Sequence, residues 1–382
     1  MATQKLYYED SFLTDFTATV TACEETKKGF AVILSATAFY PEGGGQPCDL
    51  GRLDEANVLD VKERGEEVLH LCDKPLPVGS TVSGRIDWAR RFDFMQQHSG
   101  EHIVSGLIHK KYGYHNVGFH LGNDVVTIDF DGMLTLEDLL AMEAAANRYI
   151  WQDHDVRCWY PSPEELPQVN YRRKKDLPWP VRIVEFPGAD ICACCGTQVQ
   201  RTGQIGLVKI LSCVKFHQGV RVEMLSGQRA MDHLCQVYEQ NRMVSQAFSA
   251  KIPQTGAAAQ RMNEQLAAEK FRATALQKRL FRFIAQGYAG RDFALHFEED
   301  LLSAALRELA DAMAEVCGTA VVCSGQDDTG YGICIISRRE DVRPLGKAAA
   351  DALGGRGGGK PEAFQGSVKA TRQQIEAFFQ SR

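Results

Sequence analysis

The chain lacks any run of apolar residues that approaches the roughly 20 needed to cross a bilayer. Its first residues, MATQKLYYEDSF, also lack the apolar core that follows a basic start in a secretory signal peptide. These two absences argue against a membrane protein and against a secreted one. We therefore expect a cytoplasmic protein without a membrane partner.

Neither sign of charge is in large excess, because 43 Lys and Arg residues stand against 49 Asp and Glu residues for a net charge of −6. This balance argues against a non-specific polyanion binder but allows local basic patches. The content of 44% hydrophobic and 24% charged residues is typical of soluble globular proteins. A length of 382 residues exceeds one ordinary core, so several domains are expected.

The pattern of apolar residues predicts an α+β multidomain fold. Short β-branched or alternating segments at the start predict a small β-barrel, and strands mixed with two helices follow it. Two long amphipathic segments separated by PQTG predict a helical hairpin, and the last hundred residues return to an α/β pattern. The predicted domains are the barrel at 1–87, an α+β domain at 88–227, the hairpin at 228–285, and an α/β domain with a glycine-rich tail at 286–382.

The stretch HSGEH places His98 and His102 four residues apart in a helix predicted over 88–112. That spacing puts both imidazoles on one helix face, as a metal site requires. The same letters fit the H-x-x-E-H pattern of a group of zinc peptidases, in which Glu101 would be the general base. The alternative is that the two histidines bind no metal and are ordinary surface or core residues of the helix.

Twelve cysteines in a long chain without a secretion signal are expected to be thiols or metal ligands in a reducing compartment. Three of them, Cys192, Cys194 and Cys195, lie in one predicted loop about 90 residues after HSGEH. Mixed imidazole and thiolate ligands favour zinc, and catalytic zinc sites commonly use three protein ligands. Two histidines from the helix and one cysteine from the loop would complete such a site.

Four motifs in order resemble the alanyl-tRNA editing proteins, which are free-standing relatives of the editing half of alanyl-tRNA synthetase. The motifs are FYPEGGGQPCDLG at 39–51, HSGEH, CCGTQVQRTGQIG with the following GVRVEMLSG, and GGRGGGKPEAFQGS. The last of these is similar to a C-terminal domain shared with the synthetase and with DHH-type phosphoesterases. The hairpin and this tail resemble the long form of the editing protein.

The resemblance implies hydrolysis of tRNA(Ala) mischarged with serine or glycine, with a Zn²⁺ ion as cofactor. The family's metal ligands match His98, His102 and Cys194, whereas Gln198 stands where the family has a histidine. A glutamine amide is a poor zinc ligand, so the departure leaves three alternatives: an open water position, substitution by Cys192 or Cys195, or weakened binding. We favour the open position. In this interpretation Glu101 becomes a bystander rather than a base.

Substrate contacts are predicted from the chemistry of the ester. The glycines Gly43, Gly44 and Gly45 would let backbone amides approach the ester or the terminal adenosine, although three glycines also suit a plain turn. A pocket that accepts serine and rejects alanine needs a polar partner for the hydroxyl group. The predicted partners are Gln46, Thr197 and His120.

Basic clusters predict contacts with the tRNA backbone. The residues expected to make them are Arg172, Arg173, Lys174 and Lys175 near the site, and Arg356 and Lys360 in the tail. A homodimer through the hairpin or the C-terminal domain is a further hypothesis. The alternatives for function are a non-catalytic tRNA-binding homologue with a weakened metal site, the zinc peptidase, and a DHH-type phosphoesterase, for which the chain shows no Asp-His-His core.

Overall fold

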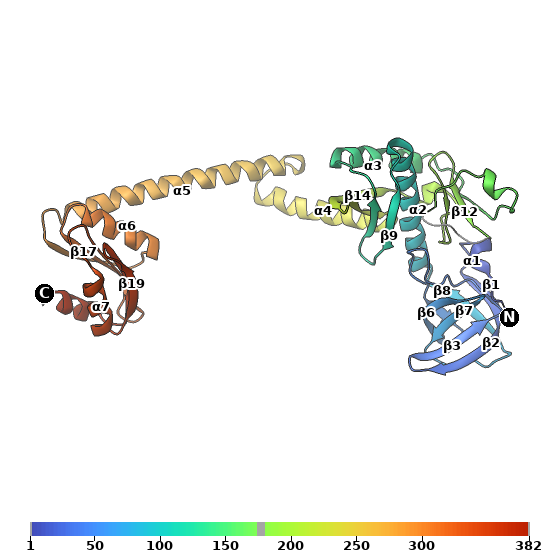
Figure 1. Cartoon of the computed structure of the whole chain (residues 1–382), viewed down its shortest axis with the longest axis horizontal. Coiled ribbons are helices and arrows are strands. Elements are labelled where there is room, and N and C mark those ends of the chain that lie inside the picture. The colour runs from blue at the N-terminus through green and yellow to red at the C-terminus, as the bar shows by residue number, and fades with distance from the viewer. Residues whose placement is uncertain (1, 174–179, 381–382) are drawn as a thin grey trace. The chain divides into compact units, whose positions relative to one another are not determined.

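A computed structural model describes residues 2–173 and 180–380 of the chain (Figure 1). The chain divides into two compact units, Met1–Arg242 and Met243–Arg382, and each is described by itself. Both units combine helices with sheets, which confirms the predicted mixed, multidomain character. Within the described residues, no helix has both the length and the apolar character that a membrane span requires.

The first part of unit 1 consists of short strands with one buried face. In β8 (Thr81–Ile86) every second residue is buried and those between are exposed, the period that packs a strand on a core. Six strands close on themselves around this core in the order β2 (Asp15–Thr26), β3 (Gly29–Leu34), β7 (Glu67–Cys72), β6 (Ala56–Arg64), β5 (Gly51–Leu53) and β8. Beside them are β1 (Gln4–Lys5), α1 (Leu6–Glu9) and β4 (Ala36–Thr37).

Helix α2 (Trp88–Tyr112) follows β8 and confirms the helix predicted over 88–112. The Asp87 side chain accepts a hydrogen bond from the Arg90 backbone at its start, and Gly113 ends it with a φ of 73°. All residues from 94 to 106 are buried, so polar and apolar faces alike lie inside the unit. The buried histidines and glutamate of this helix need hydrogen-bond partners or a bound ion, because buried polar groups are rarely left unpaired.

Two small sheets surround α2. One has the order β14 (Val208–Phe216), β15 (Gly219–Ser226), β10 (Val126–Phe130) and β9 (Asn116–Leu121), with α3 (Leu136–Ile150) packed beside β14. The other contains β11 (Arg157–Trp159), β12 (Ile183–Phe186) and β13 (Asp190–Ala193). A capping box of Thr135 and Asp138 opens α3. Short 3₁₀ turns lie at Leu166–Gln168 and Thr202–Ile205.

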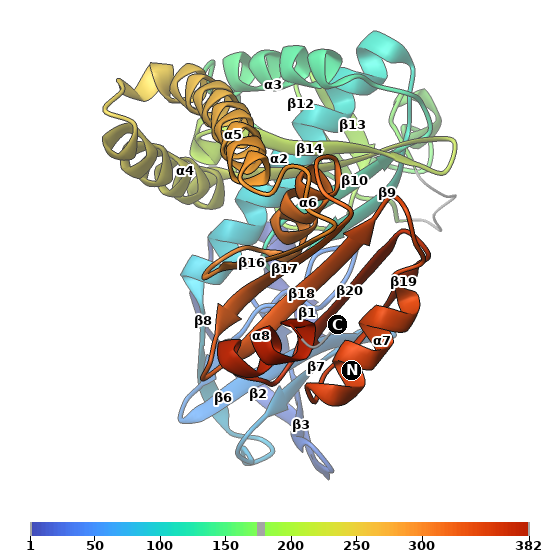
Figure 2. The same cartoon turned by 90° about the vertical axis from the view of Figure 1, so that its left-hand side faces the viewer.

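The predicted pair of long helices is present as α4 (Gly227–Ala247) and α5 (Thr255–Gln286), separated by a 3₁₀ turn at Ile252–Gln254. Unit 2 is built on a five-stranded sheet in the order β16 (Phe293–Glu298), β17 (Thr319–Gln326), β18 (Gly330–Ser337), β20 (Ala363–Val368) and β19 (Arg356–Lys360) (Figure 2). Helix α6 (Ser303–Ala314) packs on one face, and α7 (Arg343–Ala352) and α8 (Arg372–Gln380) pack on the other.

The glycine-rich tail is an edge strand rather than the irregular segment that its composition suggests. Arg356–Lys360 pairs antiparallel with β20. A Cβ added at Gly359 would lie 1.9 Å from the Ala363 carbonyl oxygen, and one at Gly357 would lie 2.5 Å from the Phe364 ring. The glycines therefore permit a close approach of two strands, which the general weakness of glycine in strands does not reveal.

Candidate metal centre and active site

One face of α2 carries four polar side chains at the spacing i, i+3, i+4 and i+7, namely His98, Glu101, His102 and Ser105. Each is at most 4% exposed. The two imidazole rings stack with centroids 5.2 Å apart and planes inclined by 10°. The helical period thus brings both predicted histidines to one buried spot.

Cys194 comes to the same spot from the loop after β13. Its sulfur lies 3.4 Å from Nε2 of His98, and the three donor atoms of His98, His102 and Cys194 all lie within 4.8 Å of one another. The Arg182 guanidinium fixes this loop, because it donates to the carbonyl oxygens of Cys194 at 3.0 Å and Gly196 at 2.9 Å.

The outer nitrogen of each histidine is held by a protein acceptor. Nδ1 of His98 donates to Oε1 of Gln46 at 3.0 Å, and Nδ1 of His102 donates to Oδ2 of Asp190 at 2.9 Å. Arg172 in turn forms a bidentate ion pair with Asp190, at 2.6 and 2.7 Å. These contacts hold Nδ1 of each ring and leave Nε2 of each ring on the side of the cluster, the arrangement found in metal-ligating histidines.

The buried donors fit a metal ion. Among the described residues, Nε2 of His102 is buried without a hydrogen-bond partner. An unpaired buried nitrogen is costly unless something else occupies it. Two imidazole nitrogens and one thiol sulfur form a donor set suited to zinc. His102 also belongs to a second, buried cluster with Asp190 and Cys192.

Electrostatic contacts set the protonation of these groups. Burial alone would raise the pKa of the Cys194 thiol, but His98 and His102 hold that pKa well below its ordinary value. Burial would also raise the pKa of Asp190, whereas the bonds from His102 and Arg172 hold it below its ordinary range. Cys194 is therefore poised as a thiolate, the form that binds metals.

Gln198 lies beside this cluster but does not offer it an oxygen. Its Oε1 accepts a hydrogen bond from the Ser99 hydroxyl at 2.7 Å, and its Nε2 donates toward the Cys194 sulfur at 3.7 Å. An amide nitrogen that carries two protons has no lone pair for a metal. The side chain that replaces the expected histidine therefore supports the thiolate, and the open-position alternative fits this arrangement.

The glycine loop forms one wall of a cavity of about 410 Å³ that also contains the three donors. Gly44 and Gly45 have φ values of 59° and 82°. A Cβ on Gly44 would lie 2.7 Å from the Cys195 sulfur, and one on Gly45 would lie 2.6 Å from the Phe119 ring. The close approach that the sequence predicts is therefore present, and it is an approach to the cysteine loop and to β9.

Three residues predicted as substrate contacts are not among those that line the cavity. Nε2 of Gln46 donates to the Thr197 hydroxyl at 2.8 Å, and its Oε1 already accepts from His98, so both ends of this buried amide are engaged by the protein. Thr197 is fully buried. His120 is exposed on β9 and does not line the cavity. Gln46 and Thr197 hold the site together instead of facing its cavity.

Glu101, which we expect to be a bystander to the chemistry, lies in the cavity wall. Its Oε1 accepts from the Ser105 hydroxyl at 2.6 Å and from the Asn116 amide. The helical spacing from His98 could have placed Glu101 and Ser105 on the same face of α2. Asn116 and Asp190 had no such signal, because β9 and β13 bring them from outside the motifs.

The predicted tRNA-binding residues belong partly to unit 1 and partly to unit 2. Arg172 is largely buried in its ion pair with Asp190, which makes it part of the site's framework. Arg173 is exposed near Tyr171, with its guanidinium 6.0 Å from the ring centroid. Lys174 and Lys175 lie outside the described residues. Arg356 and Lys360 are exposed on β19 of unit 2.

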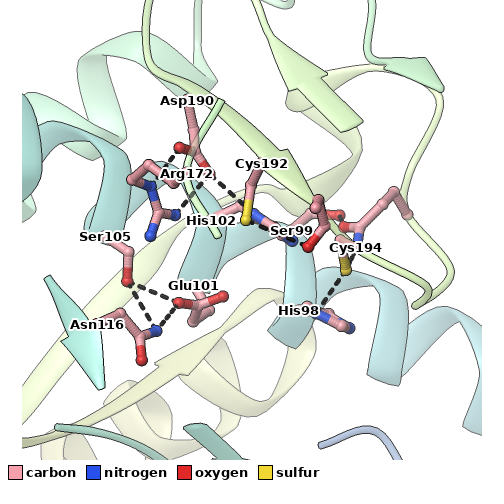
Figure 3. A network of polar contacts seen from close by, with 12 residues as sticks. His98, Ser99, Glu101, His102, Ser105, Asn116, Arg172, Asp190, Cys192 and Cys194 are labelled. Carbon is pink, nitrogen blue, oxygen red and sulfur yellow. Dashed lines mark hydrogen bonds and ion pairs between the residues drawn. The ribbon is translucent and has the colours of Figure 1, made fainter. Parts of the chain in front are cut away.

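Figure 3 shows the polar contacts around His98, His102 and Cys194 and the separate cluster of Glu101, Ser105 and Asn116. In that view His102 lies between the pair formed by His98 and Cys194 and the cluster of Glu101, Ser105 and Asn116. Val117 and Phe119 add an apolar wall to the same cavity. Such a cavity, mainly apolar with a few convergent polar groups, is typical of a small-ligand site.

Three family models match separate parts of the chain. The model described as the threonyl and alanyl tRNA synthetase second additional domain matches residues 181–230, which include the cysteine loop. A model of class II (A) tRNA synthetases matches residues 2–90, and a DHHA1 domain model matches residues 290–381.

Similar proteins extend the match to nearly the whole chain. Alanyl-tRNA editing protein Aarsd1-A of Xenopus laevis is 29% identical over 368 residues, or 92% of this chain and 88% of the relative. Alanyl-tRNA editing protein Aarsd1 of Mus musculus is 29% identical over 408 residues, which cover 97% of this chain and 96% of the relative. An alanine–tRNA ligase of Thermofilum pendens is 30% identical over 399 residues, which span 97% of this chain but 43% of the ligase.

Proposed function

We propose that this chain, whose resemblance to the alanyl-tRNA editing proteins is confirmed by these matches, is a trans-editing hydrolase. It would deacylate mischarged tRNA(Ala), chiefly seryl-tRNA(Ala) and also glycyl-tRNA(Ala). The observation that carries the proposal is the meeting of the glycine loop, His98, His102 and Cys194 around one cavity. The cytoplasm is the compartment that suits this activity.

His98, His102 and Cys194 would hold a zinc ion in this proposal, with a fourth position open. A bound zinc ion would supply a Lewis acid close to the ester. The chain's own contribution is orientation: Gln46 and Asp190 fix the two imidazoles, and Gln198 donates toward the thiolate. Residues in such supporting positions commonly matter for metal affinity almost as much as the ligands.

Hydrolysis adds water to the ester carbonyl carbon, breaks the bond from that carbon to the ribose oxygen, and returns a proton to that oxygen. The products are the free amino acid and tRNA(Ala). Gly44 and Gly45 let the cavity wall approach the ester without an intervening side chain. Val117 and Phe119 would keep bulk water from that wall, which strengthens polar contacts inside the cavity.

A non-catalytic tRNA-binding homologue is the second candidate, because Gln198 replaces a histidine ligand. The intact trio of donors and the orphaned Nε2 of His102 favour the enzyme over this alternative. The peptidase alternative explains neither the cysteine loop nor the glycine loop.

The test is to incubate the purified chain with seryl-, glycyl- and alanyl-tRNA(Ala) and to follow the ester that remains. We expect serine and glycine to be released and alanine to be spared. Release of none of them, with seryl-tRNA(Ala) bound all the same, would support the non-catalytic homologue and contradict the proposal.

A further inference from the structure

The second half of helix α5 is strongly basic and plays no part in the mechanism described above. Its last residues, 270–286, contain Lys and Arg side chains but no Asp or Glu, in a chain whose net charge is −6. The cations are Lys270, Arg272, Lys278, Arg279 and Arg282. A local concentration of positive charge on an acidic chain is typical of an electrostatic binding surface.

The helical period gathers most of these cations on one face. Residues at i, i+7 and i+11 return to the same side of an α-helix, because one turn takes 3.6 residues. Two neighbouring rows of α5 follow this spacing, and each combines two cations with one phenylalanine. The rows are Phe271, Lys278 and Arg282, and Arg272, Arg279 and Phe283. We call these six exposed residues the basic face of α5.

The far side of the same helix anchors it to unit 2. Phe281 is 3% exposed and Ile284 is partly buried, and both belong to the apolar core to which α6 contributes. The end of α5 accordingly packs on α6 (Figure 1). Because the buried side is fixed on this core, the basic face is directed away from it.

The cations of the basic face are largely unpaired. In the part of the chain that the structure describes, only Arg272 has a carboxylate partner, Glu269 at 3.8 Å. Phe271 and Phe283 beside them are 79% and 80% exposed. Unpaired cations interleaved with exposed aromatic rings are typical of nucleic-acid-binding surfaces, in which the cations contact phosphates and the rings stack on bases.

Charge complementarity favours RNA over a second copy of this chain. Two copies of the basic face would set four cations against four, which is repulsive. A polyanion with unpaired bases matches both the charge and the aromatic rings, and the proposed substrate is such a molecule. The cavity of about 410 Å³ has room for only the aminoacyl end of a tRNA, so the rest of the molecule lies outside it.

We propose that the basic face of α5 binds the sugar–phosphate backbone of the tRNA substrate outside its aminoacyl end. The inference rests on the proposed function for the identity of the RNA and deepens it, because it names a second region that holds the same molecule. A backbone contact adds affinity whether or not the tRNA carries an amino acid. Phe271 and Phe283 stack on unpaired bases next to the contacted phosphates.

Three full-length variants are compared with the wild type. The charge variant combines Lys278→Gln, Arg279→Gln and Arg282→Gln. Its matched control combines Lys27→Gln, Lys28→Gln and Lys74→Gln, which removes the same charge from exposed turns of the barrel in unit 1. The stacking variant combines Phe271→Ala and Phe283→Ala.

The experiment measures binding and hydrolysis separately. Binding is the Kd of deacylated tRNA(Ala), determined over a series of salt concentrations. Hydrolysis is followed with seryl-tRNA(Ala) and with a short seryl oligonucleotide that ends in CCA and lacks the body of the tRNA. The mass of each protein in solution is determined beside these assays.

We expect the charge variant to raise the Kd of deacylated tRNA(Ala) about tenfold or more and to reduce the slope of log Kd against log salt concentration by about 2–3, as for three lost phosphate contacts. KM for seryl-tRNA(Ala) should rise in parallel, with kcat unchanged. The short ester should be hydrolysed at the wild-type rate. The control should match the wild type in every assay, and the stacking variant should weaken binding without changing the salt slope.

An unchanged Kd and salt slope in the charge variant would overturn this inference, even with a wild type that hydrolyses seryl-tRNA(Ala). Equal losses in the charge variant and its control would also overturn it, because they would trace binding to net charge. A wild-type dimer that the stacking variant converts to a monomer with unchanged Kd would assign this face to a second copy and overturn it as well. Weaker tRNA binding by the charge variant, beside a wild type that hydrolyses neither ester, would support this inference and contradict the proposed hydrolysis.

Discussion

At the scale of single residues, Gln198 is the position at which the candidate metal centre differs from the family pattern. Its oxygen is bonded to Ser99 and its nitrogen faces the Cys194 sulfur. The site therefore has three strong donors and a neutral amide where a fourth would be. Restoring a donor at this position should change metal retention more than it changes the fold.

We predict that Gln198→His slows the loss of zinc to a chelator, because an imidazole nitrogen would face the thiolate and the other donors. Gln200→His is the matched control, since Gln200 lies two residues on and is exposed. Zinc release followed with a chromogenic chelator measures the effect. Equal release rates for Gln198→His and the wild type would show that this side chain does not reach the metal.

At the scale of elements, the glycine loop combines a left-handed backbone with a close approach. Gly44 and Gly65 have similar φ values of 59° and 65°, but only a Cβ on Gly44 would meet the Cys195 sulfur, while nothing lies within 4 Å at Gly65. The two positions therefore separate backbone strain from damage to the cavity.

We predict that Gly44→Ala and Gly65→Ala each lower the free energy of unfolding by about 1–2 kcal/mol from the left-handed backbone alone. Only Gly44→Ala should also reduce hydrolysis of seryl-tRNA(Ala), because it displaces Cys195 into the cavity. Urea unfolding and the deacylation rate measure the two effects. Full activity in Gly44→Ala would mean that the loop does not shape the active cavity.

The barrel contains a titrating group of its own. His70 in β7 is fully buried, with Nε2 2.8 Å from the Thr37 hydroxyl and Nδ1 donating to the Val32 carbonyl at 3.2 Å. Burial lowers the pKa of His70 from 6.5 to about 4. Between these values the unfolded chain binds a proton that the folded chain does not, so stability falls as the pH falls.

We predict that this histidine lowers the free energy of unfolding by about 1.4 kcal/mol for each pH unit as the pH falls from 6.5 to 4. Urea unfolding of the wild type and of His70→Gln at pH 7 and pH 5 checks it. The glutamine variant should lose less stability between the two pH values than the wild type does. Identical losses would show that another group causes the acid sensitivity.

Much of the element pattern could be predicted from the sequence, because apolar periods report which face is buried. The bounds of α2 follow from Asp87 and Gly113 at its ends. Residue types alone predict a candidate zinc site of two helix histidines and one loop cysteine, and the family resemblance selects Cys194. The strand at Arg356–Lys360 could not be predicted, because glycine usually weakens strands. Here the glycines allow a close cross-strand contact with β20 that only the structure reveals. Asn116 and Asp190 could not be predicted either, because only the packing of β9 and β13 on α2 brings them to the site.

At the scale of the whole molecule, the candidate metal donors all lie in unit 1, and so do Trp88, Trp151 and Trp159. The fourth tryptophan, at position 179, falls in the sequence range of the same unit but outside the described residues. Tryptophan fluorescence therefore reports on the unit that would bind zinc. A ligand that binds only the folded state stabilises it by mass action, by about 4 kcal/mol at a thousand times its Kd.

We predict that a chelator lowers the thermal midpoint seen by tryptophan fluorescence by on the order of 10 °C. Cys194→Ser should unfold at the lower temperature with or without the chelator. A thermal midpoint of the wild type that is the same with and without the chelator would contradict zinc binding in unit 1.

The most direct test of the account is to measure zinc content and seryl-tRNA(Ala) hydrolysis together in the wild type and in Cys194→Ala. The account predicts one zinc ion per wild-type chain and release of serine, with both lost or strongly reduced in the variant. A wild-type chain in whose presence the seryl ester lasts as long as it does in buffer would contradict it.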